Sequence, residues 1–119
     1  MSKIRSSKTK PELALRKAIR GLGFSYQPKI RFNPDFAHRK KKIAVFVDGD
    51  FWHGYNWQKL GKLPPKGFWQ RKIIRNLERD IRYTLALKEK GWKVIRIWEH
   101  QIKKDIGQVK RIIMQRVKN

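Results

Sequence analysis

The chain has 119 residues and a formal net charge of +22, from 31 lysines and arginines against 9 aspartates and glutamates. This length suits one compact domain. The 39% hydrophobic content is enough for a packed core and excludes a wholly disordered chain. The absence of cysteine excludes disulfides and thiolate zinc sites. No apolar run of about 18 residues occurs, so the sequence predicts no transmembrane helix.

The excess of basic residues indicates a polyanionic partner, for which nucleic acid is the first candidate. Charge alone does not indicate catalysis, because ribosomal and chromatin proteins are equally basic. A membrane surface is the weaker alternative, since no segment combines a basic face with a broad apolar one. The first ten residues, MSKIRSSKTK, lack the apolar run of a secretion signal, so we expect a cytoplasmic protein associated with the nucleoid.

The N-terminal part of the chain predicts one helix between two irregular segments. Residues 1–8 are polar and basic, and we expect them to form a flexible arm. Thr9-Lys10-Pro11-Glu12 has the pattern of a capping box at the start of a helix. Apolar residues then recur at helical spacing until Gly21 or Gly23, where the helix should end. Residues 24–28 are expected to be extended or a loop.

Two short strands and a long loop are predicted next. A strand begins at Asp35, a basic turn occupies residues 39–42, and the apolar run 43–47 predicts a buried strand, so the two strands form a hairpin. Residues 49–67 combine glycines, an adjacent pair of prolines and several aromatics, which indicates a functional loop and not a linker.

The remainder of the chain predicts a helix, a strand and a second helix. The long helix covers residues 68–90 and ends at Gly91, the strand covers 92–98, and a basic helix covers about 104–117. We expect the whole chain, 1–119, to form a single α/β domain with a central mixed β-sheet flanked by helices. The inner face of the long helix is predicted to consist of Trp69, Ile73, Leu77, Ile81 and Leu85.

Two acids lie at related places in the predicted hairpin. Asp35 begins one strand and Asp48 ends the other, so strand pairing would bring their side chains together. Two carboxylates at close range are costly unless a cation neutralises them. Mg²⁺ prefers one or two carboxylates together with water and phosphate oxygens. We therefore predict a Mg²⁺ site at Asp35 and Asp48. The alternative is that Asp48 and Asp50 are solvated residues of a turn.

A histidine follows this strand closely. His53 could act as a general base that deprotonates an attacking water, if a carboxylate fixes its orientation and its pKa. Asp80, on the inner or flanking face of the long helix, is the candidate partner. The alternative is a structural histidine in a loop. We expect no zinc, because the three histidines are widely spaced and no thiolate is present.

Three aromatic residues are candidates for contact with DNA. Phe51 and Trp52 are adjacent in a loop bounded by glycines, so both side chains cannot be in the core, and Trp69 begins the long helix. Aromatic wedges can unstack and bend a duplex at a cost of a few kcal/mol, offset by new protein contacts. Core packing is the alternative for any one of them.

The basic residues form two groups that could hold a phosphate backbone. The run Arg39-Lys40-Lys41-Lys42 is expected to lie beside the acid pair. Within this run, Lys41 and Lys42 are the predicted DNA-binding residues. Such contacts set the register of the complex and make affinity fall steeply with salt. A solvated surface is the alternative for a single lysine, but it does not account for the collective excess. Basic residues also recur along one side of the long helix at Arg71, Lys72, Arg75 and Arg79.

These segments together carry a resemblance to a known family. From about residue 3 to residue 102 the chain is similar to the very short patch repair (Vsr) endonucleases. The Phe51-Trp52-His53 tripeptide in its context and the Gly91 to Glu99 segment are the specific matches. The supporting matches are Thr9 to Glu12, Pro34-Asp35-Phe36, Phe46 to Asp50, Phe68-Trp69, Asn76 and Arg79-Asp80.

The resemblance implies a restriction-endonuclease-like fold and a Mg²⁺-dependent reaction that nicks DNA beside T:G mismatches. It implies that Asp35 is the principal metal ligand and that the Val47 carbonyl is a further one. It also implies that His53 is the base, held by Asp80. Glu12 matches an acid near the family's active centre, and the aromatic residues named above match intercalating side chains.

The chain also departs from the family pattern. A histidine that assists at the scissile phosphate is usual at the position of Asp48. The family's structural zinc uses cysteines and a histidine, and we expect that zinc to be absent here. The matching positions hold Asp50, Tyr55, Trp57 and His100.

The sequence thus predicts a Mg²⁺-dependent DNA endonuclease, for which Mn²⁺ could substitute, that leaves a 5′-phosphate and a 3′-hydroxyl. The first hypothesis for the substrate is DNA with a T:G mismatch, which the enzyme would nick for repair. The alternative is matched duplex DNA, as for a homing or restriction nuclease. A third hypothesis is a non-catalytic DNA-binding module. We expect a monomer that binds double-stranded DNA and no membrane. Repair proteins or other domains as partners are left open.

Overall fold

The computed structural model describes residues 9–49 and 68–118, with the side chains of 68–70 not included. The predicted arm 1–8 and most of the predicted functional loop therefore lie outside the described residues. The elements are α1 (Lys10–Ala18), β1 (Ser25–Tyr26), β2 (Phe36–His38), β3 (Ile43–Asp48), α3 (Phe68–Glu89), β4 (Lys93–Trp98), α4 (Glu99–Lys104) and α5 (Ile106–Lys118).

The sheet has four strands in the order β1-β2-β3-β4. The pairs β1–β2 and β2–β3 are antiparallel, and β3–β4 is parallel. Phe36 lies opposite Val45, so residues 39–42 form the turn of the predicted hairpin. Lys42 adopts the left-handed conformation there, with φ 55°. The predicted mixed sheet is therefore confirmed.

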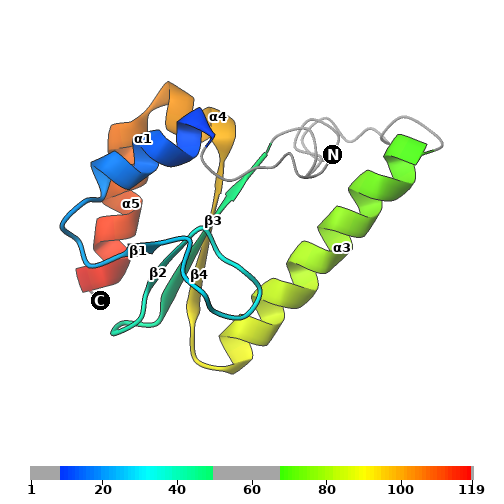
Figure 1. The fold of residues 1–119 in the computed structure, drawn as a ribbon, viewed down its shortest axis with the longest axis horizontal. Helices are drawn as coiled ribbons and strands as arrows, with labels where there is room; N and C mark the ends of the chain where they lie inside the picture. The colour runs from blue at the N-terminus through cyan, green and yellow to red at the C-terminus, as the bar shows by residue number, and fades with distance from the viewer. Residues whose placement is uncertain (1–8, 50–67, 119) are drawn as a thin grey trace.

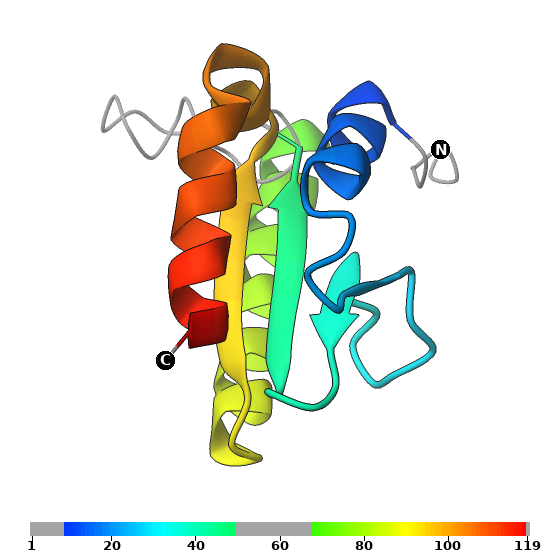
Figure 2. The ribbon, with the colours of Figure 1, turned by 90° about the vertical axis from the view of Figure 1, so that its left-hand side faces the viewer.

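Helices cover both faces of the sheet. Figures 1 and 2 show α1, α4 and α5 on one face and the long α3 on the other. Alternate residues of β3 serve the two faces, because successive side chains of a strand point to opposite sides. Ile43 and Val45 join the larger core, which includes Leu15 of α1 and Ile113 of α5, while Phe46 joins a smaller core with Leu87 of α3.

The long helix is rotated relative to the sequence prediction. Ile73 is buried as expected, but Ile81 is 61% exposed and Leu85 is 57% exposed. The expectation that Ile81 and Leu85 face inward is wrong. Polar residues occupy that face instead, since Asp80 and Thr84 contact Arg96 of the sheet. A hydrogen-bonded polar cluster between helix and sheet thus replaces an apolar stripe.

Polar side chains cap the N-termini of α1 and α5. The Thr9 Oγ1 accepts a hydrogen bond from the Glu12 amide at 3.4 Å, which gives half of the predicted capping box. The Glu12 carboxylate accepts a hydrogen bond from the Tyr26 hydroxyl of β1. At the other end, the predicted final helix corresponds to α5, whose start is capped by the Asp105 carboxylate, which accepts from the Gln108 amide at 3.1 Å; the short α4 before it was not predicted. Among the described residues no helix is long and apolar enough to cross a bilayer.

Candidate active site

Asp35 lies against the end of strand β3, as the hairpin predicts. It immediately precedes β2, and its backbone amide donates to the Val45 carbonyl at 2.9 Å. Its side-chain Oδ2 accepts a hydrogen bond from the Val47 amide at 2.7 Å. The Val47 amide therefore holds the Asp35 carboxylate in a fixed position at the end of β3. A fixed position suits a carboxylate that binds a metal ion.

Glu12 of α1 lies beside Asp35 and interacts with its carboxyl group. It is a buried residue in the first turn of α1, 5% exposed, and Tyr26 of β1 donates to its Oε1 at 2.8 Å. The pKa of Asp35 is raised from 3.8 to about 7, chiefly by burial; the nearby Glu12 and Asp48 carboxylates also raise it, whereas the hydrogen bond from the Val47 amide lowers it. Three carboxylates thus act on one another at this end of the molecule.

Asp48 is the last residue of β3 and is buried, with an exposed fraction of 7%. Its Oδ1 accepts from the Arg96 Nη1 at 2.8 Å. The Nε of Arg96 donates to the Thr84 hydroxyl at 2.9 Å. The Nη2 donates to the Asp80 carbonyl at 3.3 Å and lies 3.9 Å from its carboxylate. One guanidinium, stacked 4.2 Å from the centroid of the Phe46 ring, thus ties β3, β4 and α3 together.

Sequence reasoning missed Arg96, although a signal was present. The residue interrupts the apolar run of β4, between Ile95 and Ile97. A charged residue inside a buried strand needs an acid partner, and that requirement could have directed attention to Asp48. Tyr26 was also missed, and nothing in its sequence context distinguishes it.

Asp80 faces the sheet as proposed for the partner of His53. Its side chain is 14% exposed and lies near Arg96 and also near Arg79, whose Nη2 is 3.5 Å away. His53 lies outside the described residues, so the pairing of His53 with Asp80 stays a prediction. The same holds for Phe51 and Trp52, and for the side chain of Trp69.

The acids of this basic chain are unevenly distributed. Glu99, at the start of α4, comes to the same end of the sheet, with its Oε1 3.6 Å from where a Cβ on Gly49 would lie. Of the 9 acidic residues, the members of this group are Glu12, Asp35, Asp48, Asp80 and Glu99.

A divalent cation fits the chemistry of this site. Asp35 and Glu12 are buried carboxylates whose mutual repulsion a cation would relieve. Each has one oxygen engaged by a donor, from Val47 and Tyr26 respectively. Within the described ranges no three acid or histidine side chains are placed to bind one ion together. Mg²⁺ usually keeps several water ligands and takes phosphate oxygens, so a site with few protein ligands suits it.

A cleft opens beside Asp35. It has a volume of about 690 Å³ and is formed mainly by the segment between β1 and β2. Lys29 and Arg31 line it together with Asp35, so basic side chains flank the acid in the same cavity. This arrangement can hold a phosphate near the carboxylate.

The predicted phosphate-binding residues are placed differently from one another. Lys41 and Lys42 are exposed, but they immediately precede β3, at least about 20 Å from Asp48 at the strand rise of about 3.3 Å per residue. The expectation that this run lies beside the acids is wrong, because the hairpin turn is at the opposite end of the strands. The Lys42 Nζ donates to the Lys90 carbonyl at 3.2 Å. Lys72 and Arg79 are partly exposed and Arg75 exposed along α3.

The chain is similar to several known proteins. The family described as DNA mismatch endonuclease Vsr matches residues 1–59. The type II nicking enzyme V.NmeDIP of Neisseria meningitidis serogroup C is 46% identical over 111 residues, which are 88% of this chain and 74% of that enzyme. The DNA mismatch endonuclease Vsr of Escherichia coli is 38% identical over 82 residues, covering 66% of this chain and 52% of that protein.

A solved structure supports the fold. The catalytic domain of the homing endonuclease I-Bth0305I superposes with a TM-score of 0.63 at 21% identity, over 92% of this chain and 94% of that domain. The mixed sheet with helices on both faces is therefore a restriction-endonuclease-like fold, as predicted. With 46% identity to a nicking enzyme over most of its length, and with the matching family profile, the chain belongs to the Vsr family of DNA mismatch endonucleases.

Proposed function

We propose that this chain is a divalent-metal-dependent DNA endonuclease that nicks one strand at or near a T:G mismatch. The observation that carries the proposal is the meeting of Asp35, Glu12 and Asp48 in a chain of net charge +22. A strongly basic surface attracts DNA, whereas a buried acidic centre within it repels phosphate unless a cation is bound. The nicking and mismatch activities named for its relatives support the same reading.

The residues divide the chemistry among them. Asp35 and Asp48, with the Val47 carbonyl, would hold Mg²⁺, or Mn²⁺ in its place, and Glu12 would complete the negative surroundings of the ion. When bound, the ion would polarise the phosphate and stabilise the charge that develops on its oxygens. The Val47 amide and Tyr26 orient the acids.

The attacking water requires a base. We assign this role to His53, with Asp80 orienting the ring and stabilising the imidazolium that forms when His53 takes the proton from water. Arg96 holds Asp80 through its carbonyl at 3.3 Å and so fixes the helix that carries it. Phe51, Trp52 and Trp69 are proposed to unstack the mismatched step. Lys72, Arg75 and Arg79 on α3, with Lys41 and Lys42, are proposed to contact phosphates.

A mismatch panel tests this proposal. The protein is incubated with T:G and matched T:A duplexes that differ in one base, with Mg²⁺, with Mn²⁺ and with chelator. Faster nicking of T:G that requires the metal and is lost in Asp35→Asn supports the proposal. Equal rates on both duplexes would instead favour a nuclease of matched DNA. Binding without cleavage in either metal would indicate a non-catalytic module.

A further inference from the structure

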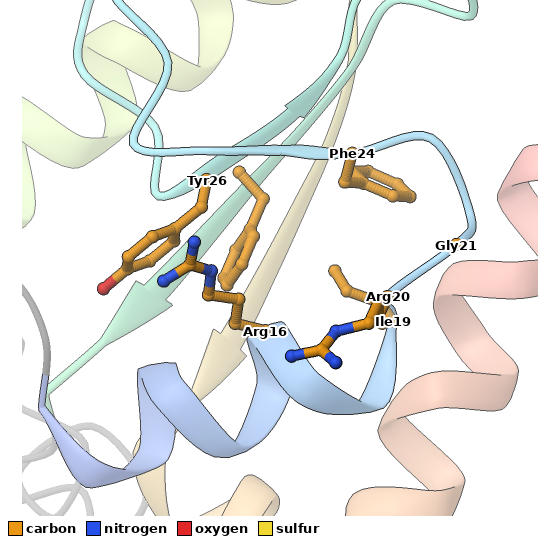
Figure 3. A pocket seen from close by; sticks show the side chains of 7 residues that line it. Arg16, Ile19, Arg20, Gly21, Phe24 and Tyr26 are labelled. Carbon is orange, nitrogen blue, oxygen red and sulfur yellow. The ribbon is translucent and has the colours of Figure 1, made fainter.

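A second cavity lies between α1 and β1, on the face of the sheet opposite α3. Its volume is about 240 Å³ (Figure 3). Its polar side chains are arginines of α1 and of the turn after it, and its aromatic rings come from β1, β2 and the residue before β1. The lining residues are Arg16, Ile19, Arg20, Gly21, Phe24, Tyr26 and Phe36.

The two arginines at this cavity are exposed. Within the described part of the chain neither Arg16 nor Arg20 has a carboxylate in salt-bridge range. The Arg16 guanidinium lies 4.7 Å from the centroid of the Tyr26 ring, on the side of α1 where Figure 3 also shows Arg20. Guanidinium groups beside partly buried aromatic rings suit a ligand that combines an anionic group with a flat or apolar part. A nucleotide of DNA has this combination.

The cavity is connected to the acidic centre through α1 and the turn that follows it. Glu12 and Arg16 are four residues apart on α1, a rise of about 6 Å in a helix, and Arg20 follows four residues later in the turn beyond the end of α1 at Ala18. That step is close to the separation of successive phosphates along one strand. The hydroxyl of Tyr26, whose ring carries Arg16, also donates to Glu12 at 2.8 Å. A strand whose scissile phosphate lies at the acids would thus place its next phosphates at the arginines.

We propose that Arg16, Arg20 and the Tyr26 ring form a subsite for the nucleotides that flank the scissile phosphate on the strand being cut. This rests on the proposed function for the position of the cut. The arginines bind the successive phosphates, and the rings contact the sugar and base between them. The subsite sets the register of the strand relative to Asp35.

A methylphosphonate scan tests the subsite. Duplexes carrying one neutral phosphate at each position near the mapped nick are bound to the parent and to Arg16→Ala, Arg20→Ala and the double variant, without divalent metal. We expect the parent to lose affinity at one or two positions beside the nick on the cut strand, and the double variant to be insensitive there. Each single variant should lower the slope of log affinity against log salt by about 0.9.

Two controls separate this subsite from general charge and from folding. Arg111→Ala, on the exposed face of α5, removes the same charge outside the cavity and should keep the positional sensitivity of the parent. Thermal unfolding of each variant confirms that it is folded. If the double variant remains as sensitive as the parent at every position, the subsite is excluded even if the protein cleaves. If the parent cleaves no duplex but still loses affinity at adjacent neutral phosphates, and this loss requires both arginines, the proposed endonuclease function is excluded. The phosphate-binding subsite is then retained.

Discussion

The guanidinium of Arg96 holds the carboxylate of Asp48 at 2.8 Å, and both groups are largely buried. A histidine is usual at this position in the family that the sequence resembles. Here an acid stands there and is neutralised from the neighbouring parallel strand. Arg96 therefore offsets part of the charge of Asp48, whose carboxylate still raises the pKa of Asp35 together with Glu12. The same guanidinium also bonds Thr84 and Asp80, so α3 is fixed to the sheet at the site.

Replacing Arg96 by methionine should destabilise the protein by about 2 kcal/mol. The change leaves the carboxylate of Asp48 buried without its cation, and partial exposure of the arginine reduces the cost from that of a fully buried pair. Urea unfolding at neutral pH measures the loss. The double variant Arg96→Met/Asp48→Asn should regain part of it, and Arg111→Met should change stability by less than about 0.5 kcal/mol. Equal stability of Arg96→Met and the parent would show that the pair contributes nothing.

Replacing Asp35 by asparagine should stabilise the metal-free protein above neutral pH while abolishing cleavage. The pKa of Asp35 is raised from 3.8 to about 7 in the fold, chiefly by burial. The native state then binds more protons than the unfolded state between these values, so this group's stability contribution is present at low pH and is lost as pH rises. The slope is up to about 1.4 kcal/mol per pH unit. Asparagine does not titrate and can still accept from the Val47 amide.

Thermal unfolding of the two proteins in chelator between pH 4 and pH 8.5 measures this difference. The variant should gain relative to the parent as pH rises to about 7, and the gain should level off above it. Added Mg²⁺ should stabilise the parent and not the variant, because only the carboxylate binds the ion. If the difference in melting temperature between the variant and the parent does not vary with pH, the raised pKa of Asp35 is contradicted.

Replacing Tyr26 by phenylalanine should slow cleavage without weakening DNA binding. The ring that supports Arg16 remains, but the hydroxyl that donates to Glu12 at 2.8 Å is removed. A hydrogen bond to a charged group contributes about 1.5–3 kcal/mol, so we expect the cleavage rate to fall by about tenfold or more. Single-turnover cleavage and binding in chelator separate the two effects. A parallel loss of affinity would mean that the hydroxyl contacts DNA directly.

The parts of the fold set by local pattern were predictable from the sequence. The hairpin that brings Asp35 to β3 followed from two apolar runs with a basic turn between them, and the register then fixed Asp35 opposite the end of β3. The helix α1 followed from Thr9 and Pro11 at its start. In each case the signal lies within a few residues of the element that it determines.

The parts that failed depend on contacts between distant segments. Lys42 is near Asp48 in sequence, but strand length places it at the opposite end of the sheet. The pair Arg96 and Asp48 is 48 residues apart, and only the parallel pairing of β3 and β4 brings the side chains together. Apolar spacing along α3 fits two faces, so periodicity alone could not choose between Ile81 and the polar Asp80 as the inward residue.

The rotation of α3 can be tested by one substitution made at two positions. Ile73 is fully buried, so Ile73→Ala should cost about 2–5 kcal/mol through lost packing and the cavity left behind. Ile81 is 61% exposed, and Ile81→Ala should be neutral within about 0.5 kcal/mol, because alanine also favours the helix. Chemical denaturation of both variants provides the comparison. A cost at Ile81 that matched the cost at Ile73 would mean that the apolar stripe faces inward, which would release Asp80 and Thr84 from Arg96.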